Sequence, residues 1–179
     1  RGSFVEEAAA RRVDSGRDCR QALLADVDGD GWLDAVVVNH IQSNELYINL
    51  QTGAFVESGS VFGFDDAGPG RGIAVMDVTG DGLLDLYVTN QNSRDLLYVR
   101  TGPVFQEDGV ARGISASTGV HMGVARLDVG LDGDTDVVVG VEGHLDALWR
   151  NDGRGYVQDV AAAAGFPPAL RSSLAVSVG

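Results

Sequence analysis

The sequence predicts an all-β fold, a segment of a β-propeller made of four-stranded blades with Asp-rich calcium loops. Three observations support this prediction. An Asp-rich stretch of nine residues occurs three times at a constant spacing of 51 residues. Short runs of β-forming residues flank each stretch, and almost no part of the chain has helical periodicity. Four strands in a repeat of roughly 40–50 residues are typical of a propeller blade.

The three stretches concentrate the negative charge of the chain. They are DVDGDGWLD at 26–34, DVTGDGLLD at 77–85 and DVGLDGDTD at 128–136, and they hold eleven of the 26 acidic residues. Two carboxylates about 4 Å apart repel each other by roughly 4 kcal/mol at an effective dielectric near 20. A solvated acidic surface does not predict such regular spacing. The formal net charge of −13 therefore indicates repeated sites that need a cation.

Each repeat is expected to contain four strands. The expected first strands are 22–25, 73–76 and 124–127, and the second strands are 35–38, 86–88 and 137–139. The expected third strands are 45–48, 96–99 and 147–150, and the fourth strands are 54–58, 104–108 and 156–160. These runs are β-branched or aromatic and too short for helices. The second strand of each repeat is apolar on both faces, which predicts a strand covered on both sides.

The register of the repeats sets the expected boundaries. The complete blades are expected at 16–66, 67–117 and 118–166. Because SFVEE at 3–7 resembles a fourth strand, residues 1–15 are expected to end a preceding blade, and 167–179 resemble the first strand of a next one. Propellers typically have 4–8 blades. We therefore expect residues 1–179 to be a segment of one propeller, whose remaining blades or another chain cover both ends.

The acidic stretches have the ligand spacing of the first half of a calcium loop. Such a loop has oxygen ligands at positions 1, 3 and 5, a glycine at 6 and a backbone carbonyl at 7. The expected ligands in loop one are Asp26, Asp28, Asp30, the carbonyl of Trp32, and Asp34. In loop two they are Asp77, Thr79, Asp81, the carbonyl of Leu83, and Asp85. In loop three they are Asp128, Asp132, the carbonyl of Asp134, and Asp136, with Gly130 leaving position 3 without a side chain.

These ligand sets predict up to three Ca²⁺ ions of unequal affinity, because the number of charged ligands tunes calcium binding. We expect loop one to bind most tightly and loop three to be partly empty. An EF-hand requires Glu at position 12 and a following helix, whereas position 12 here is Val37, Val88 or Val139 inside an expected strand. Magnesium is disfavoured because it prefers few carboxylates and several waters. Acidic turns without a metal are the structural alternative.

The string LWRNDGRGYVQDVAAAAGF at 148–166, with the loops and their flanking strands, resembles the FG-GAP/VCBS repeat. The resemblance is strongest to the version in the cartilage acidic protein-like family, and 44–49 and 94–100 match it more loosely. It covers essentially the whole chain. It implies an integrin-α-like propeller of seven blades with calcium in the turn between the first two strands of each blade. It also implies a secreted or cell-surface protein used in adhesion, matrix or carbohydrate contact.

Other classes of protein are disfavoured. Nucleic-acid-binding domains are usually basic, and no run approaches the 18 apolar residues of a membrane span. The single cysteine, Cys19, excludes an internal disulfide and a Cys-based metal site, and we expect it to be half-buried. Carboxylate catalysis is disfavoured because a catalytic pair should occur once and not once per blade.

The histidines and tryptophans give weaker signals. His40 and His144 are expected in turns and in solvent, whereas His121 has no counterpart in the other repeats, where Gly70 and Cys19 stand. Trp149 is expected in the core. Trp32, inside loop one, is expected to pack rather than to bind a ligand, since aromatic side chains usually bury.

These observations favour a calcium-binding extracellular β-propeller scaffold that binds a protein or a glycan, or that serves adhesion or structural assembly. The expected place is extracellular, at the cell surface or in the secretory lumen. The alternative is the propeller module of a secreted carbohydrate-active enzyme, a lyase or a hydrolase, with its catalytic residues outside this segment or at the mouth of the channel. Convergent polar residues that do not repeat would favour the enzyme.

Overall fold

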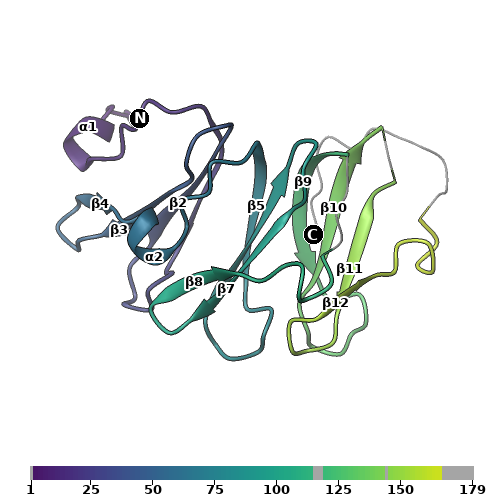
Figure 1. Ribbon diagram of the computed structural model, residues 1–179. Helices are drawn as coiled ribbons and strands as arrows, with labels where there is room; N and C mark the ends of the chain where they lie inside the picture. Colours follow the sequence, from purple (N-terminus) through teal and green to yellow (C-terminus); the bar gives the residue numbers. More distant parts are fainter. Residues whose placement is uncertain (1, 115–118, 144, 167–179) are drawn as a thin grey trace.

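Three four-stranded antiparallel sheets make up the chain in the computed structural model, which describes residues 2–114, 119–143 and 145–166 (Figure 1). In every sheet each strand pairs with the strand next to it in the chain. The fold class predicted from the sequence, an all-β segment of a propeller, is confirmed. Among these residues, helix is limited to two single turns, α1 (Ala8–Arg11) and α2 (Gly59–Phe62).

The three sheets have the same order of strands. The first contains β1 (Cys19–Ala25), β2 (Asp34–Asn39), β3 (Glu45–Asn49) and β4 (Phe55–Glu57). The second contains β5 (Gly70–Met76), β6 (Asp85–Asn90), β7 (Leu96–Thr101) and β8 (Val104–Glu107). The third contains β9 (Val120–Leu127), β10 (Asp136–Glu142), β11 (Ala147–Asn151) and β12 (Val157–Asp159). The twelve strands expected in the three complete blades are all present, within a few residues of their expected bounds.

The first strand of each sheet is longer than its apolar run. β1 and β5 each begin three residues before the runs at 22–25 and 73–76, and β9 begins four residues before the run at 124–127. The added residues include small and polar ones, and the pairing with the second strand shifts register there in all three sheets. A bulge of this kind bends the strand and increases its local twist.

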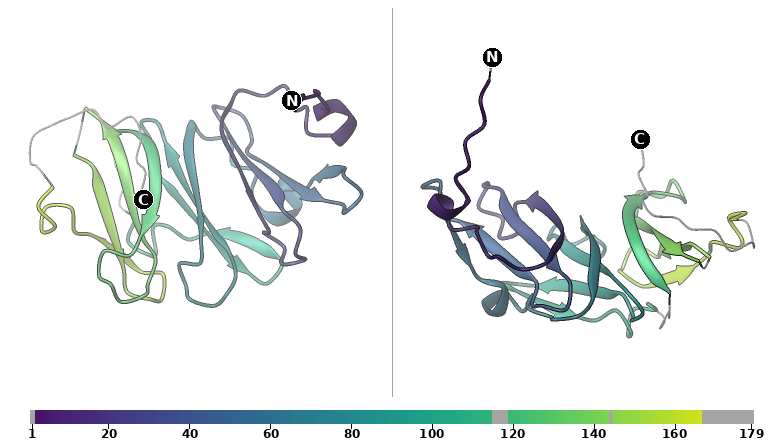
Figure 2. Two further views of the ribbon diagram at one scale, coloured as in Figure 1. Left: turned by 180° about the vertical axis from the view of Figure 1, so that it is seen from behind. Right: turned by 90° about the horizontal axis from the view of Figure 1, so that it is seen from above.

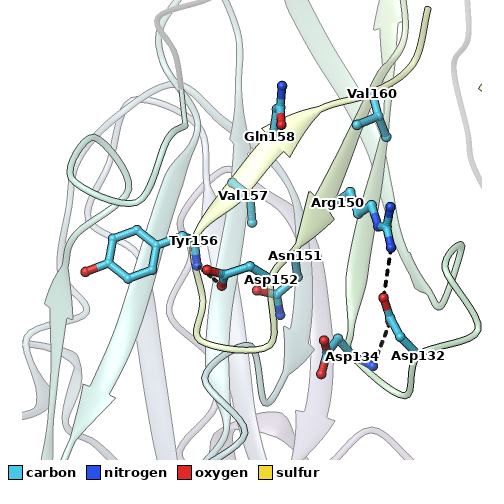
Figure 3. A pocket seen from close by; sticks show the side chains of 9 residues that line it. All are labelled: Asp132, Asp134, Arg150, Asn151, Asp152, Tyr156, Val157, Gln158 and Val160. Carbon is cyan, nitrogen blue, oxygen red and sulfur yellow. Dashed lines mark hydrogen bonds and ion pairs between the residues drawn. The ribbon is translucent and has the colours of Figure 1, made fainter. Parts of the chain in front are cut away.

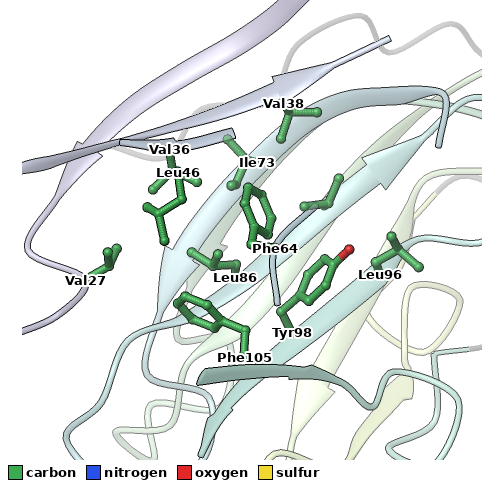
Figure 4. Close-up of a cluster of buried hydrophobic side chains, with 11 residues drawn as sticks. Val27, Val36, Val38, Leu46, Phe64, Ile73, Leu86, Leu96, Tyr98 and Phe105 are labelled. Carbon is green, nitrogen blue, oxygen red and sulfur yellow. The ribbon is translucent and has the colours of Figure 1, made fainter. Parts of the chain in front are cut away.

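The hydrophobic core lies between the sheets. One cluster of buried side chains joins the first and second sheets, with Leu46 and Val36 meeting Leu86 and Ile73 (Figure 4). Phe64, from the segment after α2, fits into this cluster and packs edge-on against Tyr98 at 5.1 Å between ring centroids. A second cluster joins the second and third sheets. A sheet that is apolar on both faces buries both faces by stacking on its neighbours. The second strands, which are apolar on both faces, predicted this arrangement.

The sheets follow one another in an arc when the molecule is seen from above (Figure 2). Their first strands are neighbours, since β5 contacts both β1 and β9. Isolated bridges join the residue after the second strand of one sheet to the region where the first strand of the next sheet begins, at His40 with Pro69 and at Gln91 with Val120. This is the arrangement of adjacent blades around a common axis.

The ends of the chain differ from the sequence expectation. Residues 3–7, expected as a fourth strand, are not in a strand, because the third strand that would pair with them is not among the residues present. α1 lies 51 residues before α2, so this segment keeps the register of the connection that follows a fourth strand. Near the C-terminal end of the described residues, 161–165 form a series of turns and not a helix. The strand expected within 167–179 lies outside the described residues.

Candidate metal centres

The three acidic loops join the first and second strands of each sheet and lie at the same edge of the molecule (Figure 1). Pairs at the strand ends close them, as with Ala25 opposite Asp34 in the first sheet. Tight loops of this length need left-handed backbone, which glycine adopts without steric cost. In loop one Gly29 and Gly31 supply it, with φ of 83° and 89°.

The first aspartate of each loop organises the backbone around it. In loop one, Asp26 Oδ1 accepts hydrogen bonds from the N–H groups of Gly29 (2.8 Å) and Asp30 (3.0 Å). Its Oδ2 accepts one from the N–H of Gly31 (2.9 Å). Asp77 accepts the equivalent three bonds in loop two, at 2.7, 3.2 and 2.7 Å. The carboxylate of the first aspartate therefore stabilises the turn of the loop without a bound cation.

Loop one brings three carboxylates together. Asp26, Asp28 and Asp34 each offer an oxygen, and these oxygens all lie within 4.8 Å of one another. Two oxygens that bind one Ca²⁺ at about 2.3–2.6 Å can be at most about 5 Å apart. Hard carboxylate oxygens at this spacing are what calcium prefers, so the residues present fit the predicted cation.

The fourth predicted carboxylate of loop one points elsewhere. Asp30 Oδ1 accepts a hydrogen bond from the N–H of Trp32 (2.8 Å), and its Oδ2 accepts one from Gln51 Nε2 (2.9 Å). In loop two, Asp81 likewise accepts a bond from the N–H of Leu83 (2.9 Å). The role of Asp30 and Asp81 as ligands stays a prediction, as does that of the backbone carbonyls at position 7.

The last aspartate of each loop is buried and holds two backbone groups, a role that the sequence did not indicate. Asp34 Oδ2 accepts the N–H of Val27 (3.0 Å), and its Oδ1 accepts the N–H of Asn49 (2.8 Å) at the end of β3. The same pairs recur at Asp85 and at Asp136. Burial raises the pKa of Asp34 and Asp85, and their N–H partners oppose this rise. Each carboxylate thus fastens its loop to the third strand.

Residues at the end of the third strand also tie the loops to the next sheet. Asn151 Nδ2 donates to the carbonyl oxygen of Val78 in loop two at 2.8 Å. Arg100 donates from Nη1 to the carbonyl oxygen of Val27 and from Nη2 to that of Asp28 (3.2 Å), both in loop one. The only sequence signal for this contact is the constant distance of 15 residues from the last aspartate of the loop of the same sheet.

Loop three departs from the other two (Figure 3). Asp128 accepts hydrogen bonds from the N–H groups of Asp132 (3.2 Å) and Gly133 (3.0 Å). Asp132, however, pairs with Arg150 at 3.1 Å, and the Arg150 guanidinium holds the pKa of Asp132 below its ordinary value. Asp132, Asp134 and Arg150 line an open cavity of about 490 Å³. Among the described residues, only loop one forms a cluster of three carboxylates.

One histidine and the two tryptophans differ in burial. His121 is buried between the second and third sheets, with Nδ1 2.7 Å from Asp95 Oδ2, which also accepts the hydroxyl of Tyr87 (2.8 Å). Trp149 is buried as expected. Trp32 is not, because its loop extends beyond the sheets and leaves the indole 49% exposed.

Two further expectations concern the ends of the second strands and the cysteine. Cys19 is exposed and not half-buried, because it begins β1 on the face that no other sheet covers. His40 lies after β2 and contacts Arg20 Nη2 at 3.2 Å, and His144 lies outside the described residues. In the part of the chain that the structure describes, no helix is long and apolar enough to cross a membrane.

Comparisons with known proteins agree with this geometry. The profile of the FG-GAP-like repeat matches residues 26–88 and 77–139, each match running from one acidic loop through the next. Cartilage acidic protein 1 of Xenopus tropicalis is 29% identical over 156 residues, which cover 76% of this chain and 23% of that protein. The chain thus spans about a quarter of the length of this curated relative.

A solved structure has the same fold. A chain in the crystal structure of BBS1N in complex with ARL6DN, soaked with lead, superposes with a TM-score of 0.55 at 13% identity. The match covers 92% of this chain and 49% of that chain. At this identity the likeness extends to the fold alone.

Proposed function

The chain belongs to the FG-GAP-like repeat family, since the matched residues cover more than half of it, and we propose that it is a calcium-stabilised segment of a β-propeller scaffold. Loops one and two hold Ca²⁺ in this proposal. The scaffold binds a protein or a glycan, or serves structural assembly, outside the cell. The single observation that carries the proposal is the convergence of Asp26, Asp28 and Asp34.

The electrostatics of loop one support calcium over an acidic turn without a metal. Three carboxylates with oxygens within 4.8 Å repel one another, and no lysine or arginine in the described residues forms an ion pair with any of them. A bound cation would turn this repulsion into attraction. It would also fix the loop against β3 and the next sheet, because Asp34 is bonded to Asn49 and the loop carbonyls are bonded to Arg100.

Two arguments support the proposed extracellular location: the expected calcium affinity and the similarity to cartilage acidic protein 1. Extracellular calcium modules bind with Kd of roughly 10⁻⁴–10⁻³ M. A nine-residue loop without a bidentate Glu at position 12 belongs to this weak range, which only extracellular calcium fills. The relative cartilage acidic protein 1 is named for cartilage, a tissue rich in extracellular matrix.

Thermal melting tests the calcium proposal. A ligand that binds only the folded state stabilises it by RT ln(1 + [L]/Kd), roughly 2.7 kcal/mol at a hundredfold excess over Kd. Melts in millimolar CaCl₂ should therefore lie several degrees above melts in chelator, and Asp28→Asn should reduce this difference. Asp18→Asn, on the exposed segment before β1, is the control. Identical curves in calcium and chelator would contradict calcium binding, and a sub-micromolar Kd by calorimetry would remove the argument for an extracellular place.

A further inference from the structure

Loop three lacks a side chain at the position that holds a predicted ligand in the other two loops. At position 3, Gly130 replaces Asp28 of loop one and Thr79 of loop two. At position 4, Leu131 stands with φ of 53° where the other loops have glycine. Loops two and three both lack the convergent group of three carboxylates that loop one has among the described residues, but loop two keeps a side-chain oxygen at position 3, on Thr79. The third loop therefore does not fit the cation as loop one does.

An arginine occupies the place of the missing side chain. Arg150 lies on β11, and its Nη2 is 3.1 Å from Asp132 Oδ2 (Figure 3). The equivalent residues of the other sheets are Ile48 and Val99, which carry no charge. A guanidinium stays protonated at any pH that a folded protein tolerates. A carboxylate of loop three is thus paired with a permanent cation, whereas no carboxylate of loops one and two forms an ion pair with a lysine or arginine among the described residues.

The glycine and the arginine depend on each other. A Cβ atom at Gly130 would lie 2.6 Å from Asp132 Oδ2 and 3.0 Å from Arg150 Nη2. Both distances are shorter than a comfortable contact, so a side chain at position 3 would displace the ends of the Asp132 and Arg150 side chains from their present pairing. The pair is half exposed, with 50% and 36% of the two side chains accessible, so its own stabilising effect is small.

We propose that Arg150 is the built-in counter-charge of loop three and keeps this loop free of calcium, so that the chain takes ions in its first two loops only. The expected number of bound ions rests on the proposed function, in which loops one and two bind calcium. The part of the inference that concerns Arg150 and Asp132 stands independently of any metal. Blade three would then keep its loop folded when calcium is low, while the first two loops lose their cation.

The first experiment counts ions. Native mass spectrometry of the chain in CaCl₂ should show that Asp26→Asn and Asp77→Asn each remove one ion, and that Asp128→Asn leaves the number unchanged. Rebuilding loop three with Gly130→Asp and Arg150→Val together should add one ion. Loss of an ion in Asp128→Asn overturns the proposal, and so does a rebuilt loop that still binds none.

The second experiment needs no calcium. In chelator, Arg150→Val should lower the melting temperature by about 1–3 °C, the effect of a partly exposed ion pair in a chain of this size. Arg154→Val, which removes an equal charge from an exposed arginine that forms no ion pair among the described residues, should leave it unchanged.

The double variant of Arg150→Val with Asp132→Asn separates the two proposals. Its effect should be smaller than the sum of the single effects, because both substitutions remove the same interaction. Additive effects would overturn the role of Arg150 whatever the ion count. A chain that binds no calcium in any loop would instead contradict the proposed function. The comparison of the single and double variants in chelator would still decide the role of Arg150.

Discussion

At the scale of single residues, the loops differ in how well each position suits its backbone. Positions 4 and 6 of the first two loops are glycines with positive φ, and position 6 of loop three is Gly133 with φ of 89°. Leu131 is the exception, since a leucine adopts the same left-handed conformation with φ of 53°. A left-handed conformation costs a residue with a side chain about 1–2 kcal/mol. Leu131 is 90% exposed, so packing does not offset this strain.

Replacing Leu131 by glycine should therefore stabilise the protein. Part of the gain is lost because glycine adds conformational freedom to the unfolded chain, so we expect a net gain of about 0.5–1 kcal/mol. The reverse substitution, Gly29→Leu, meets no atom within 4 Å but has φ of 83°, and it should destabilise by about 1–2 kcal/mol. Urea unfolding in chelator measures both. A stabilised Gly29→Leu variant would show that backbone conformation does not limit these loops.

At the scale of the elements, each loop is joined to its own third strand by a buried carboxylate. Asp85 is completely buried, and its two oxygens accept the N–H groups of Val78 (2.9 Å) and Arg100 (2.8 Å). An unpaired buried N–H costs roughly 1–3 kcal/mol. These bonds hold β5, β6 and β7 in register, whether or not a metal is bound.

We expect Asp85→Ala to lower the free energy of unfolding by about 2–4 kcal/mol in chelator, because it leaves two buried donors without partners. Asp85→Asn keeps one acceptor and should have an intermediate effect. Asp81→Ala is the control, since Asp81 is exposed and accepts only the N–H of Leu83, and its cost should stay below about 1 kcal/mol. Urea titration of the three variants checks the order. Equal costs for Asp85→Ala and Asp81→Ala would mean that the buried bonds do not hold the loop.

A second link between elements depends on pH. Arg94, before β7, donates two hydrogen bonds to Glu107 of β8, at 2.8 and 3.0 Å. Burial acts to raise the pKa of Glu107, but the bonds from Arg94 and from the N–H of Gly109 outweigh it and hold the pKa below its ordinary value of 4.5. A carboxyl with a lowered pKa in the folded state stabilises the fold above its unfolded pKa, and this contribution disappears as the pH falls through the folded pKa.

Glu107→Gln should consequently destabilise the protein at pH 7 and lose this effect as the pH falls below about 4. The matched control is Glu57→Gln, at the equivalent position of β4, because Glu57 forms no ion pair among the described residues. The measurement is the difference in unfolding free energy from wild type across the acid range. A difference for Glu107→Gln that stays constant with pH would argue against the ion pair.

At the scale of the whole molecule, the apolar side chains of each sheet are buried against the neighbouring sheets. The outer faces of the first and third sheets have no neighbouring sheet among the described residues to cover them. On the first sheet, Ala22, Leu24, Ala35, Val37 and Phe55 line an apolar cavity of about 420 Å³ beside the N-terminal segment. Leu24 is 61% exposed there. A contiguous apolar face of this kind favours association with another surface.

Residues 1–179 expressed alone should therefore self-associate as the protein concentration rises. Leu24→Glu places a charge on the open face and should shift the chain toward the monomer in analytical ultracentrifugation. Leu131→Glu is the control, because Leu131 is exposed on a loop away from that face. A wild-type chain that stays monomeric at every concentration would mean that the N-terminal segment covers the face well enough.

The amino-acid sequence by itself determined the repeat, the strands and the position of the loops. The spacing of 51 residues can be read from the sequence without any knowledge of the fold. The β-branched runs form strands because neighbouring blades bury both of their faces. The same pattern located the aspartates of loop one. It could not tell Asp30, which turns to Gln51, from Asp28, which joins the cluster, because alternate residues of a tight loop have similar sequence signals.

Only the tertiary structure decided how the loops connect to the rest of the molecule. The bond from Asn151 to Val78 and the pair of Arg150 with Asp132 join residues 73 and 18 positions apart, and no local pattern marks them. The structure also decided that residues 3–7 are not a strand, since a strand needs a partner and not only a suitable sequence. The physical reason is the same in each case: local sequence sets what a segment can form, and contacts between distant segments select which of these forms occurs.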